Sequence, residues 1–367
     1  MKFTTTKSDL LTAISRCVPV TDSKGTMPIL STVLLDASGG DLVISATDLF
    51  RSIQTRTDAA IDTCGTICLS GKDLLERIRS MPEGMIAFSA EGTKVTIKAV
   101  GSSRRYVMHG VPGDEFPKMP MLSDDKKASR EFKTSQLTAM IGQAHHSIST
   151  DNTRQHLNAL LVETDDKSTR MVSTDGHRLT VVSNGEPAES ATKWLIPLSA
   201  VNDLRKLFDK TDCDVTLTED RGSLFVAMPE FTFTVKLVDS SPVPWKQVVP
   251  ESTKRTVTVN RAALADALRA VSVAATNKIG GMKFTFSKDK IRLESESPDA
   301  GEGFDEVVAE YDGDEITIGF NARYVMDAIG VLDSGDVVIG TSDELDPAVF
   351  RAAGNEAYMG VVMPCRV

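Results

Sequence analysis

The stretch MKFTTTKSDLLTAI, residues 1–14, decides the fold because its pattern returns twice more along the chain. Its first residues alternate as in a β-strand. The apolar residues from Leu10 to Ile14 then recur at helical spacing, as on the buried face of a helix. The same strand-to-helix pattern begins at Glu131–Lys133 and again at Thr256–Thr258. Recurrence at a long period indicates an internal repeat.

Each third of the chain also carries a second strand-to-helix unit, a hairpin and a closing strand that leads into a proline. The spacing between thirds is nearly constant, since Phe3 precedes Phe132 by 129 positions and Ile196 precedes Ile318 by 122. The predicted second helices cover residues 72–81, 199–210 and 321–331, the hairpins cover 86–99, 215–227 and 337–352, and the closing strands begin at residues 106, 233 and 358.

The economical interpretation is an α+β protein made of three tandem copies of one domain. Short, charged and polar joints near Ser123–Lys127 and Glu251–Lys254 would separate the copies. We therefore expect domains at residues 1–124, 127–250 and 253–367. Strand and helix patterns also recur by chance in mixed proteins, but the agreement of the offsets speaks against that alternative.

The composition is that of an ordinary globular protein with an acidic balance: 41% of residues are hydrophobic and the formal net charge is −10. The apolar runs fall far short of the roughly 20 residues that span a bilayer. Lys7 and Asp9 interrupt the stretch where a signal peptide would need apolar residues. We expect a cytoplasmic protein without a membrane segment. Taken alone, the charge argues against a protein that grips phosphates over its whole surface.

The five cysteines predict free thiols, mostly buried, because they form no C-x-x-C pair and their number is odd. Cys64 and Cys68 could supply half of a metal site, but no second pair or nearby histidine completes it. We expect no bound metal.

No catalytic signature is present: the sequence lacks G-x-x-x-x-G-K-[ST], G-x-G-x-x-G, H-E-x-x-H and G-x-S-x-G. Asp175 and His177, in a polar turn between apolar strands, could serve acid–base or metal chemistry. No third ligand or nucleophile is evident from the spacing, so we expect no catalytic residue and no cofactor. A metal-dependent enzyme built around this pair is the distant alternative.

Four segments together carry a resemblance to a known family. They are TDGHRL at residues 174–179, VVMPCRV at 361–367, MPIL at 27–30 behind the opening MKF, and LVDSSPVPW at 237–245. With the threefold repeat, they make the chain resemble the β subunit of bacterial DNA polymerase III over its whole length. The combination of TDGHRL with a terminal V-M-P-x-R is the specific part.

The resemblance implies a non-enzymatic sliding clamp. Two copies would join head to tail into a ring of six domains, with helices lining the interior and antiparallel sheets outside. The ring would encircle double-stranded DNA without sequence specificity and make the polymerase processive. Short linear motifs of the polymerase III alpha subunit, the clamp loader, other polymerases and repair proteins would dock on it. A clamp-like peptide-binding scaffold without a replicative role is the alternative.

The acidic net charge argues against DNA binding over the whole surface, but the charges on the predicted helices differ from those on the rest of the chain. The six predicted helices hold ten basic and seven acidic residues, a net charge of +3 against −10 for the whole chain. A mildly positive interior suits a protein that holds DNA without adhering to it, because each firm phosphate contact strengthens binding. Gln155 and His156 stand where the family often carries tyrosines. The resemblance implies DNA contact by Lys24, Lys72, Arg154, Gln155, His156 and Lys206.

The resemblance also implies a peptide-binding pocket between the second and third domains. Branched aliphatic residues and a methionine would anchor a peptide, and polar edges would fix its register. Residues 237–249 depart from the family pattern around Val243, Pro244 and Trp245, so the motif preference stays open, and Met363 could instead be part of the core. The implied pocket comprises Leu157, Thr174, Gly176, His177, Arg178, Leu179, Val243, Pro244, Val248, Val361, Val362, Met363, Pro364 and Arg366.

For the joint between subunits, the resemblance implies a basic strand of one copy against an acidic stretch of the other. Opposite charges would steer association and fix the register more than they would add affinity. The implied interface comprises Arg104, Arg105, Tyr106 and Met108 on one side, and Val273, Glu302, Asp305 and Glu306 on the other.

Overall fold

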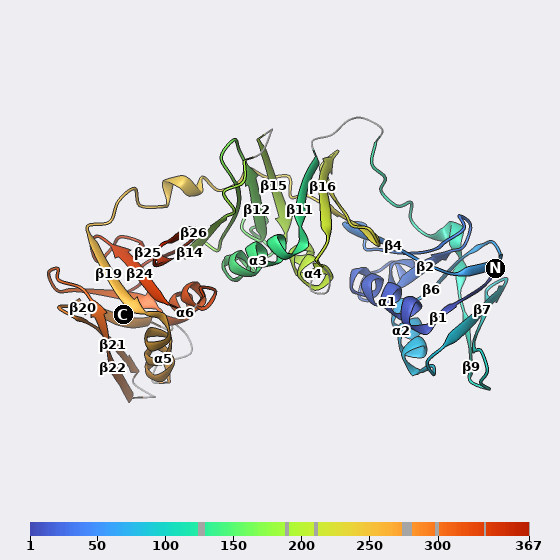
Figure 1. The fold of residues 1–367 in the computed structure, drawn as a ribbon, viewed down its shortest axis with the longest axis horizontal. Coiled ribbons are helices and arrows are strands. Elements are labelled where there is room, and N and C mark those ends of the chain that lie inside the picture. Colours follow the sequence, from blue (N-terminus) through green and yellow to red (C-terminus); the bar gives the residue numbers. More distant parts are fainter. Residues whose placement is uncertain are drawn as a thin grey trace. The chain divides into compact units, whose positions relative to one another are not determined.

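The computed structural model describes residues 1–123, 129–187, 191–208, 212–273, 281–297, 301–333 and 335–366. The chain divides into two compact units, whose elements are labelled in Figure 1. The first unit comprises Met1–Leu137 with Asn202–Leu237, and the second comprises Thr138–Val201 with Val238–Val367.

The first third begins with the predicted strand and helix. Thr6 ends the strand and caps the helix, because its hydroxyl accepts a hydrogen bond from the backbone N–H of Asp9. Ser70 does the same for the second helix through the N–H of Asp73. The elements are β1 (Lys2–Thr6), α1 (Lys7–Cys17), η1 (Val18–Val20), η2 (Pro28–Ser31), β2 (Thr32–Asp36), β3 (Leu42–Thr47), β4 (Arg51–Thr57), β5 (Ala60–Thr63), β6 (Thr66–Ser70), α2 (Gly71–Ser80), β7 (Met85–Glu91), β8 (Lys94–Ala99), β9 (Arg105–His109), β10 (Val111–Pro112) and η3 (Gly113–Glu115).

The central third repeats the order of strand, helix, strands, helix and closing strands. Its first helix passes at His145 into a short 3-10 turn. The elements are β11 (Ser129–Lys133), α3 (Thr134–Ala144), η4 (His145–Ser147), β12 (Ala159–Thr164), β13 (Thr169–Thr174), β14 (Arg178–Ser183), β15 (Thr192–Pro197), α4 (Leu198–Phe208), β16 (Asp214–Asp220), β17 (Ser223–Ala227) and β18 (Phe231–Lys236).

The last third repeats the same order once more. Asn260 and Asn321 cap its two helices, each accepting hydrogen bonds from two backbone N–H groups of the first turn. The capping role of Asn321 explains why the helix begins at Ala322 rather than at 321 as predicted. The short turn η5 (Trp245–Gln247) precedes this third, whose elements are β19 (Arg255–Asn260), α5 (Arg261–Ser272), β20 (Gly281–Ser287), β21 (Lys290–Ser297), β22 (Gly301–Glu310), β23 (Ile316–Asn321), α6 (Ala322–Gly330), β24 (Asp336–Thr341), β25 (Ala348–Ala352) and β26 (Asn355–Val362).

Two sheets build the first unit. One has the order β5-β1-β7-β8-β9, which leaves β9 at its edge, and the other has the order β10-β6-β2-β3-β4-β18-β17-β16-β11. In the second sheet, β4 of the first third pairs antiparallel with β18 of the central third, with Ile53 opposite Phe233. The sheet therefore continues across the boundary between the two repeats.

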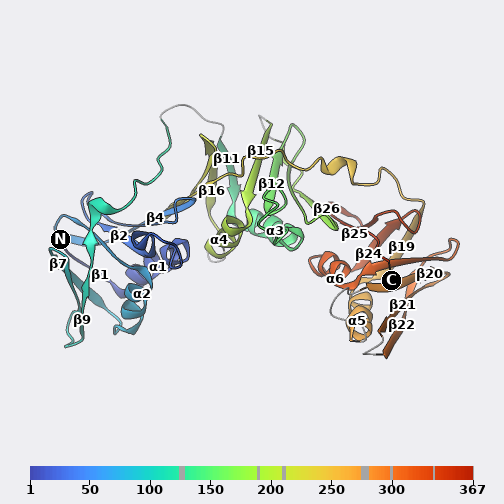
Figure 2. The ribbon, with the colours of Figure 1, turned by 180° about the vertical axis from the view of Figure 1, so that it is seen from behind.

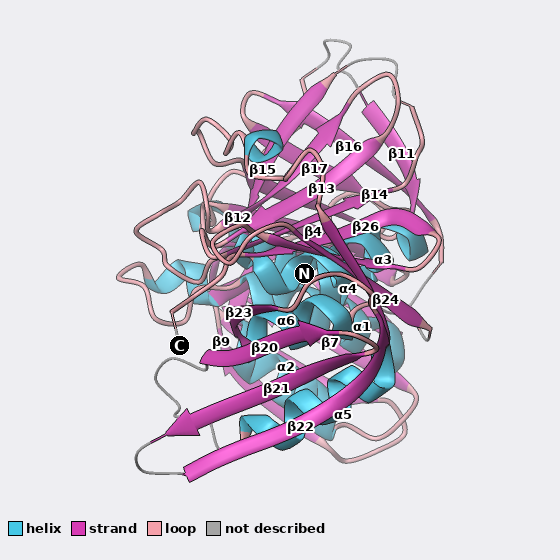
Figure 3. Ribbon diagram, turned by 90° about the vertical axis from the view of Figure 1, so that its left-hand side faces the viewer, coloured by secondary structure: helices cyan, strands magenta, loops and turns pink. Residues whose placement is uncertain are grey.

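The second unit is built on one continuous set of strands in the order β15-β12-β13-β14-β26-β25-β24-β19-β22-β21-β20-β23. Here β14 of the central third pairs antiparallel with β26 of the last third, with Leu179 opposite Val361. Strands β19 and β22 share only two residue pairs, so they part soon after Val259. Figure 3 shows β20, β21 and β22 side by side, and Figure 2 shows α5 beside β21 and β22.

The core follows the predicted periodicities. In β1, Phe3 is buried and stacks on Phe88 of β7, with ring centroids 4.6 Å apart. In α1, Leu10 and Ile14 are fully buried one turn apart, as the spacing predicts. Each such side chain contributes about 2 kcal/mol to folding through removal of apolar surface from water.

The predicted strand-to-helix units, hairpins and closing strands are confirmed in all three thirds. The second predicted joint, Glu251–Lys254, lies between η5 and β19. The first joint falls largely at 124–127, and the predicted end of the 199–210 helix falls at 209–210, so both lie outside the described residues. The domain boundaries stay a prediction.

The cysteines are free, but the expectation that most are buried is wrong. Cys17 and Cys68 are buried, Cys213 and Cys365 are half-buried, and Cys64 is exposed at the turn between β5 and β6. Burial raises the pKa of the Cys68 thiol to about 11. Within the described ranges, no helix combines the length and the apolar character that crossing a bilayer requires.

Candidate binding surfaces

The turn between β13 and β14 is organised by hydrogen bonds between its side chains and its own backbone. The hydroxyl of Thr174 donates to the carbonyl oxygen of Arg178 at 2.6 Å and accepts from the N–H of Gly176 at 3.1 Å. One carboxylate oxygen of Asp175 accepts from the N–H groups of His177 and Arg178 at 2.9 and 3.0 Å. Gly176 has a φ of +92°, a conformation that favours glycine. The predicted turn residues therefore lie together in one rigid loop.

The Arg178 side chain is held inside the subunit. Its Nε donates to Asp175 at 3.0 Å and its Nη1 donates to Asp327 of α6 at 2.6 Å. The guanidinium also lies 4.4 Å from the centre of the Tyr324 ring, and that ring stacks with the ring of His177 at a centroid distance of 6.4 Å. These contacts fill the carboxylate of Asp175 with donors, which gives it a structural role rather than the acid–base role considered above.

His146 lies behind the same turn. Its Nε2 is 3.2 Å from the hydroxyl of Thr180 on β14. Burial and, to a lesser extent, the nearby positive charge of Arg178 lower the pKa of the imidazole to about 4.

An apolar floor lies beside the turn. Leu179 and Val361 face each other across β14 and β26, and both are buried in a cluster that also includes Val181. Val249 and Trp245 pack partly buried against this cluster. A floor of branched aliphatic side chains between strands of two repeats is the kind of surface that anchors an apolar peptide side chain.

The segment 243–249 forms a wall beside the floor. The indole N–H of Trp245 donates to Glu163 of β12 at 3.0 Å, which fixes the side chain against the sheet. Val248 remains 38% exposed, whereas Leu157 is 7% exposed. Pro244 is exposed and Val243 half-buried. The departure from the family pattern therefore places an anchored indole at this wall.

The C-terminal segment continues from β26 along the turn. The N–H of Met363 donates to the carbonyl oxygen of His177 at 2.9 Å. The Met363 side chain is 37% exposed, so the alternative that it belongs to the core is wrong. Val362 is buried, Pro364 is half-buried and Arg366 is exposed. The predicted pocket residues thus belong to one unit, in which the turn contacts both the floor strand β26 and the start of the C-terminal segment.

The DNA-contact residues predicted in the first unit are all exposed. Lys24 lies in the loop between η1 and η2, which Asp22 closes by accepting from the N–H groups of Lys24 and Gly25 at 3.0 and 2.9 Å. Lys72 lies in the first turn of α2, and Lys206 lies on α4.

In the second unit, Arg154, Gln155 and His156 are exposed in the loop before β12. The Nε of Arg154 donates to Asp151 at 3.0 Å. The pKa of the Asp151 carboxyl is lowered to about 2, first by the hydroxyl and backbone N–H of Thr153 and then by Arg154. Part of the charge of Arg154 is therefore balanced locally.

The residues predicted at the subunit joint lie on two strand edges. Arg105 is exposed on β9, the edge strand of its sheet, and the preceding Arg104 is exposed as well, while Met108 is buried inside the subunit. The phenol of Tyr106 is 2.8 Å from the hydroxyl of Ser80. On the other side, Glu302 and Glu306 are exposed on β22, Asp305 is half-buried, and Val273 is 83% exposed just after α5.

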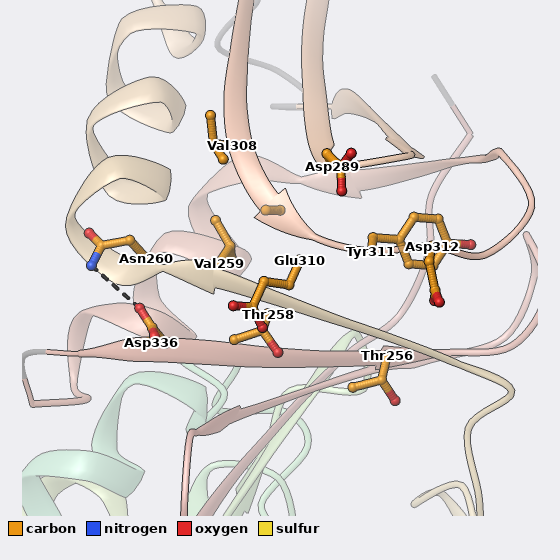
Figure 4. A pocket seen from close by; sticks show the side chains of 11 residues that line it. Thr256, Thr258, Val259, Asn260, Asp289, Val308, Glu310, Tyr311, Asp312 and Asp336 are labelled. Atoms are coloured by element: carbon orange, nitrogen blue, oxygen red, sulfur yellow. Dashed lines mark hydrogen bonds between the residues drawn. The ribbon is translucent and has the colours of Figure 1, made fainter.

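One pocket of about 700 Å³ opens where β19 and β22 part, at the end of β22 that follows the predicted joint residues (Figure 4). Its wall carries the carboxylates of Asp289, Glu310, Asp312 and Asp336, and Asn260 donates to Asp336 at 3.5 Å. Among the residues that the structure describes, no group of three or more His, Cys, Asp or Glu side chains could hold a metal ion. The pocket is a polar gap in the sheet.

Sequence reasoning missed Asp327 and Tyr324, which contact Arg178 from α6. The turn gave a partial signal, because Thr47-Asp48-Leu49-Phe50-Arg51 repeats the threonine, aspartate and arginine of residues 174–178 at the same spacing. Such a repeat predicts that the two turns are built alike, but it does not identify the partners on α6.

Family comparisons account for almost the whole chain in three consecutive blocks. Residues 1–120 match the N-terminal domain of the DNA polymerase III beta subunit, residues 131–242 its central domain, and residues 246–366 its C-terminal domain. The blocks follow the order of the three repeats.

The full length is also similar to individual proteins. A beta sliding clamp of Pseudomonas putida is 27% identical over 371 residues, with 100% of both chains covered. Among solved structures, a sliding clamp from Bartonella birtlesii bound to griselimycin is 30% identical with a TM-score of 0.94, and one from Pseudomonas aeruginosa bound to griselimycin is 27% identical with a TM-score of 0.93. Both alignments cover 100% of this chain and 100% of the other chain.

Proposed function

This chain belongs to the DNA polymerase III beta subunit family, the bacterial sliding clamps, and on that premise we propose that two copies of it close head to tail into a ring around duplex DNA. It acts as the non-catalytic clamp that makes the replicative polymerase processive. The three repeats are its three domains, which we place at residues 1–124, 127–250 and 253–367. As a bacterial replication factor it works in the cytoplasm.

The main support for ring closure is that two strand edges of the chain, β9 and β22, are complementary. Strand β9 ends its sheet, and no described strand covers β22 between Gly301 and Val308 on the side away from β21. An uncovered edge presents unpaired backbone groups that a second chain can complete. A β9 edge set against a β22 edge would continue the sheet from one subunit into the next.

Side chains on the two edges match in charge and in apolar character. Strand β22 carries Phe304 at 57% and Val308 at 84% exposure, and β9 carries Val107 at 45%. Apolar groups this exposed are typical of an interface. The charged residues proposed at this joint are Arg104 and Arg105 on one subunit and Glu302, Asp305 and Glu306 on the other, with Tyr106 and Val273 beside them and Met108 contributing backbone only.

For DNA contact, the observed helices strengthen the charge argument. Helices α1 to α6 together hold ten basic and six acidic residues, a net charge of +4 within a chain of net charge −10. Such a weak surplus favours loose phosphate contacts, which leave a ring free to slide. The proposed contacts are Lys24, Lys72, Arg154, Gln155, His156 and Lys206.

For docking, we place short linear motifs of the polymerase alpha subunit, the clamp loader, other polymerases and repair proteins on the floor made by Leu179 and Val361. Turn residues Thr174 to Arg178 form one rim, Val248 forms another, and Met363 supplies a deformable side chain. We place griselimycin, which is bound in two similar clamps, at the same pocket of this chain.

Two measurements test this function. The mass of the full chain in solution should be about 79 kDa, twice the subunit mass of 39.6 kDa. With a clamp loader and ATP, the protein should lengthen the products of DNA polymerase III on primed circular DNA. A dimer of that mass which leaves product length unchanged would identify the non-replicative scaffold instead.

A further inference from the structure

Two hairpin turns of this chain are built in the same way. The turn between β3 and β4 reads TDLFR at residues 47–51, and the turn between β13 and β14 reads TDGHR at residues 174–178. In each turn the threonine hydroxyl donates to the carbonyl oxygen of the arginine, at 2.8 Å in the first and 2.6 Å in the second. The middle residue has a φ of +74° in the first and +92° in the second.

Each arginine is also held between two carboxylates. Arg51 donates through Nε to the aspartate three residues earlier at 2.9 Å, and through Nη1 to Asp203 at 2.5 Å. Arg178 makes the equivalent bonds at 3.0 Å and, to Asp327, at 2.6 Å. Asp203 and Asp327 occupy the same position, the sixth, of the second helix of the following third. We call Asp48, Arg51 and Asp203 the first arginine lock, and Asp175, Arg178 and Asp327 the second arginine lock.

Each lock lies at a seam, by which we mean the line where strands of two repeats pair. The first seam joins β4 to β18, and the second joins β14 to β26. At the first, the carbonyl oxygen of Phe50 accepts from the N–H of Lys236, the last residue of β18, at 2.9 Å. At the second, the carbonyl oxygen of His177 accepts from the N–H of Met363, just after β26, also at 2.9 Å. An arginine held in place on the turn therefore fixes the register of the incoming strand.

The two locks differ in what lies beside them. Next to the first lock, Ser52 faces Thr234 across β4 and β18, whereas next to the second, Leu179 faces Val361 across β14 and β26. The pair beside the second lock belongs to an apolar floor that could anchor a ligand, whereas the pair beside the first lock is polar. The first lock is thus the same device without that floor, and it serves as a control within the same molecule.

At the second seam the lock reaches the pocket rim through two aromatic rings. Asp327 fixes the guanidinium of Arg178, the guanidinium lies on the ring of Tyr324, and that ring stacks with His177. Removing the carboxylate would leave a half-buried guanidinium with one partner fewer, and the turn that carries His177 would lose its outer support.

We propose that Asp327 is a positioning residue for ligand capture: through Arg178 it holds the His177 rim and the Met363 segment in the shape that the pocket needs. The inference rests on the pocket proposed above and deepens it. Helix α6 of the last third thereby sets the affinity of a site whose floor lies in the sheet.

The test measures griselimycin binding by calorimetry on the full-length dimer, together with hydrogen exchange of the Met363 and Lys236 amides. Asp327→Asn should weaken binding about tenfold, the effect of losing roughly one hydrogen bond to a charged group. It should speed exchange at Met363 and leave exchange at Lys236 unchanged. Asp327→Glu, which keeps the carboxylate, should restore affinity to within about threefold of wild type.

Asp203→Asn is the matched control, because it breaks the first lock at an even more buried carboxylate. It should speed exchange at Lys236 and leave griselimycin affinity within about twofold. Arg323→Gln removes an exposed charge that lies 4.0 Å from Asp327 without touching Arg178, and it should also leave affinity unchanged.

The outcomes separate the two proposals. If the wild-type protein fails to bind griselimycin, the pocket itself is contradicted. If the wild type binds and Asp327→Asn binds equally well, or if Asp203→Asn weakens binding as much as Asp327→Asn, the positioning role is overturned while the pocket stands.

Discussion

Met363 donates its backbone N–H to the carbonyl oxygen of His177 across 2.9 Å, which joins the segment after the last strand to the turn between β13 and β14. Strand β26 itself ends one residue earlier, and its pairs with β14 run as far as Val362 opposite Arg178. The segment from Met363 onward therefore borders the pocket beyond the last strand, where Cys365 donates its backbone N–H to the carbonyl oxygen of Gly319 on β23 at 2.8 Å.

Deletion of residues 363–367 should abolish griselimycin binding, because it removes the deformable side chain and the hydrogen bond to the turn. The dimer should persist, since the proposed joint lies on β9 and β22. Calorimetry reports the first effect and the mass in solution reports the second. Loss of both together would mean that the segment is structural, and unchanged binding would remove it from the pocket.

Replacement of Arg51 by methionine should destabilise the first unit by about 3 kcal/mol, because it leaves a buried carboxylate unpaired. The side chain of Asp203 is 7% exposed, and burial already raises its pKa despite the attraction of Arg51. Thermal and denaturant unfolding measure the loss.

Two variants sharpen this prediction. Arg51→Met combined with Asp203→Leu should recover most of the stability, since the more deeply buried carboxylate is then gone and Asp48 keeps its hydrogen bonds from the backbone N–H groups of residues 50 and 51. Arg269→Gln breaks an exposed pair with Asp266 and should change stability by less than about 0.5 kcal/mol. An Arg51→Met protein as stable as the wild type would show that the first arginine lock carries no stability.

Acid should destabilise the second unit through His146. Burial and the charge of Arg178 lower the pKa of its imidazole to about 4, whereas the unfolded chain binds the proton near the ordinary value of 6.5. Between pH 6.5 and 4 the unfolded state therefore binds a proton that the folded state does not bind. The free energy of unfolding has its full value above about pH 6.5 and falls toward pH 4 by about 1 kcal/mol per pH unit.

His146→Gln should flatten this dependence between pH 6.5 and 4.5 in thermal unfolding. The facing groups Asp327, Arg178 and His145 stay in place in this variant. His156→Gln, an exposed histidine in a loop, is the control and should keep the wild-type slope. An identical slope in His146→Gln would assign the acid sensitivity to other groups.

Charge reversal should weaken the proposed joint between subunits. Arg104→Glu with Arg105→Glu should raise the dimer dissociation constant about tenfold, mainly through slower association and most strongly at low salt. Adding Glu302→Arg and Asp305→Arg should restore the dimer, as sedimentation velocity can measure. Lys283→Glu on β20 is the control for a change of charge alone. If the reversed β9 pair dimerises normally, the joint lies elsewhere.

Much of the fold could be predicted from the sequence because each repeat shows the alternating spacing of a strand and the helical spacing of a helix. The alternation around Phe3 and the helical spacing from Leu10 to Ile14 each fix one element, and the offsets fix the other two copies. The boundaries were less predictable. Asn321 reads as a helix residue by spacing, yet its side chain caps the helix, and only the backbone shows which role it has.

The candidate site could be predicted only where its residues follow one another in the sequence. The turn from Thr174 to Leu179 is one continuous motif, so its residues could be identified together. Asp327 could not, because it lies 149 positions from Arg178 and nothing in the spacing of α6 shows that its carboxylate reaches that guanidinium. The edge of β22 that no described strand covers was equally hidden, since strand pairing across sheets is not a local property.

Topological retention on DNA is the measurement that tests the central claim most directly. The clamp should be loaded onto a nicked circular plasmid by a clamp loader with ATP, separated from free protein by gel filtration, and the plasmid then cut once. A ring around the duplex should elute with the circle and leave after linearisation. Equal retention on the linear DNA, or no accumulation on the circle, would contradict the account.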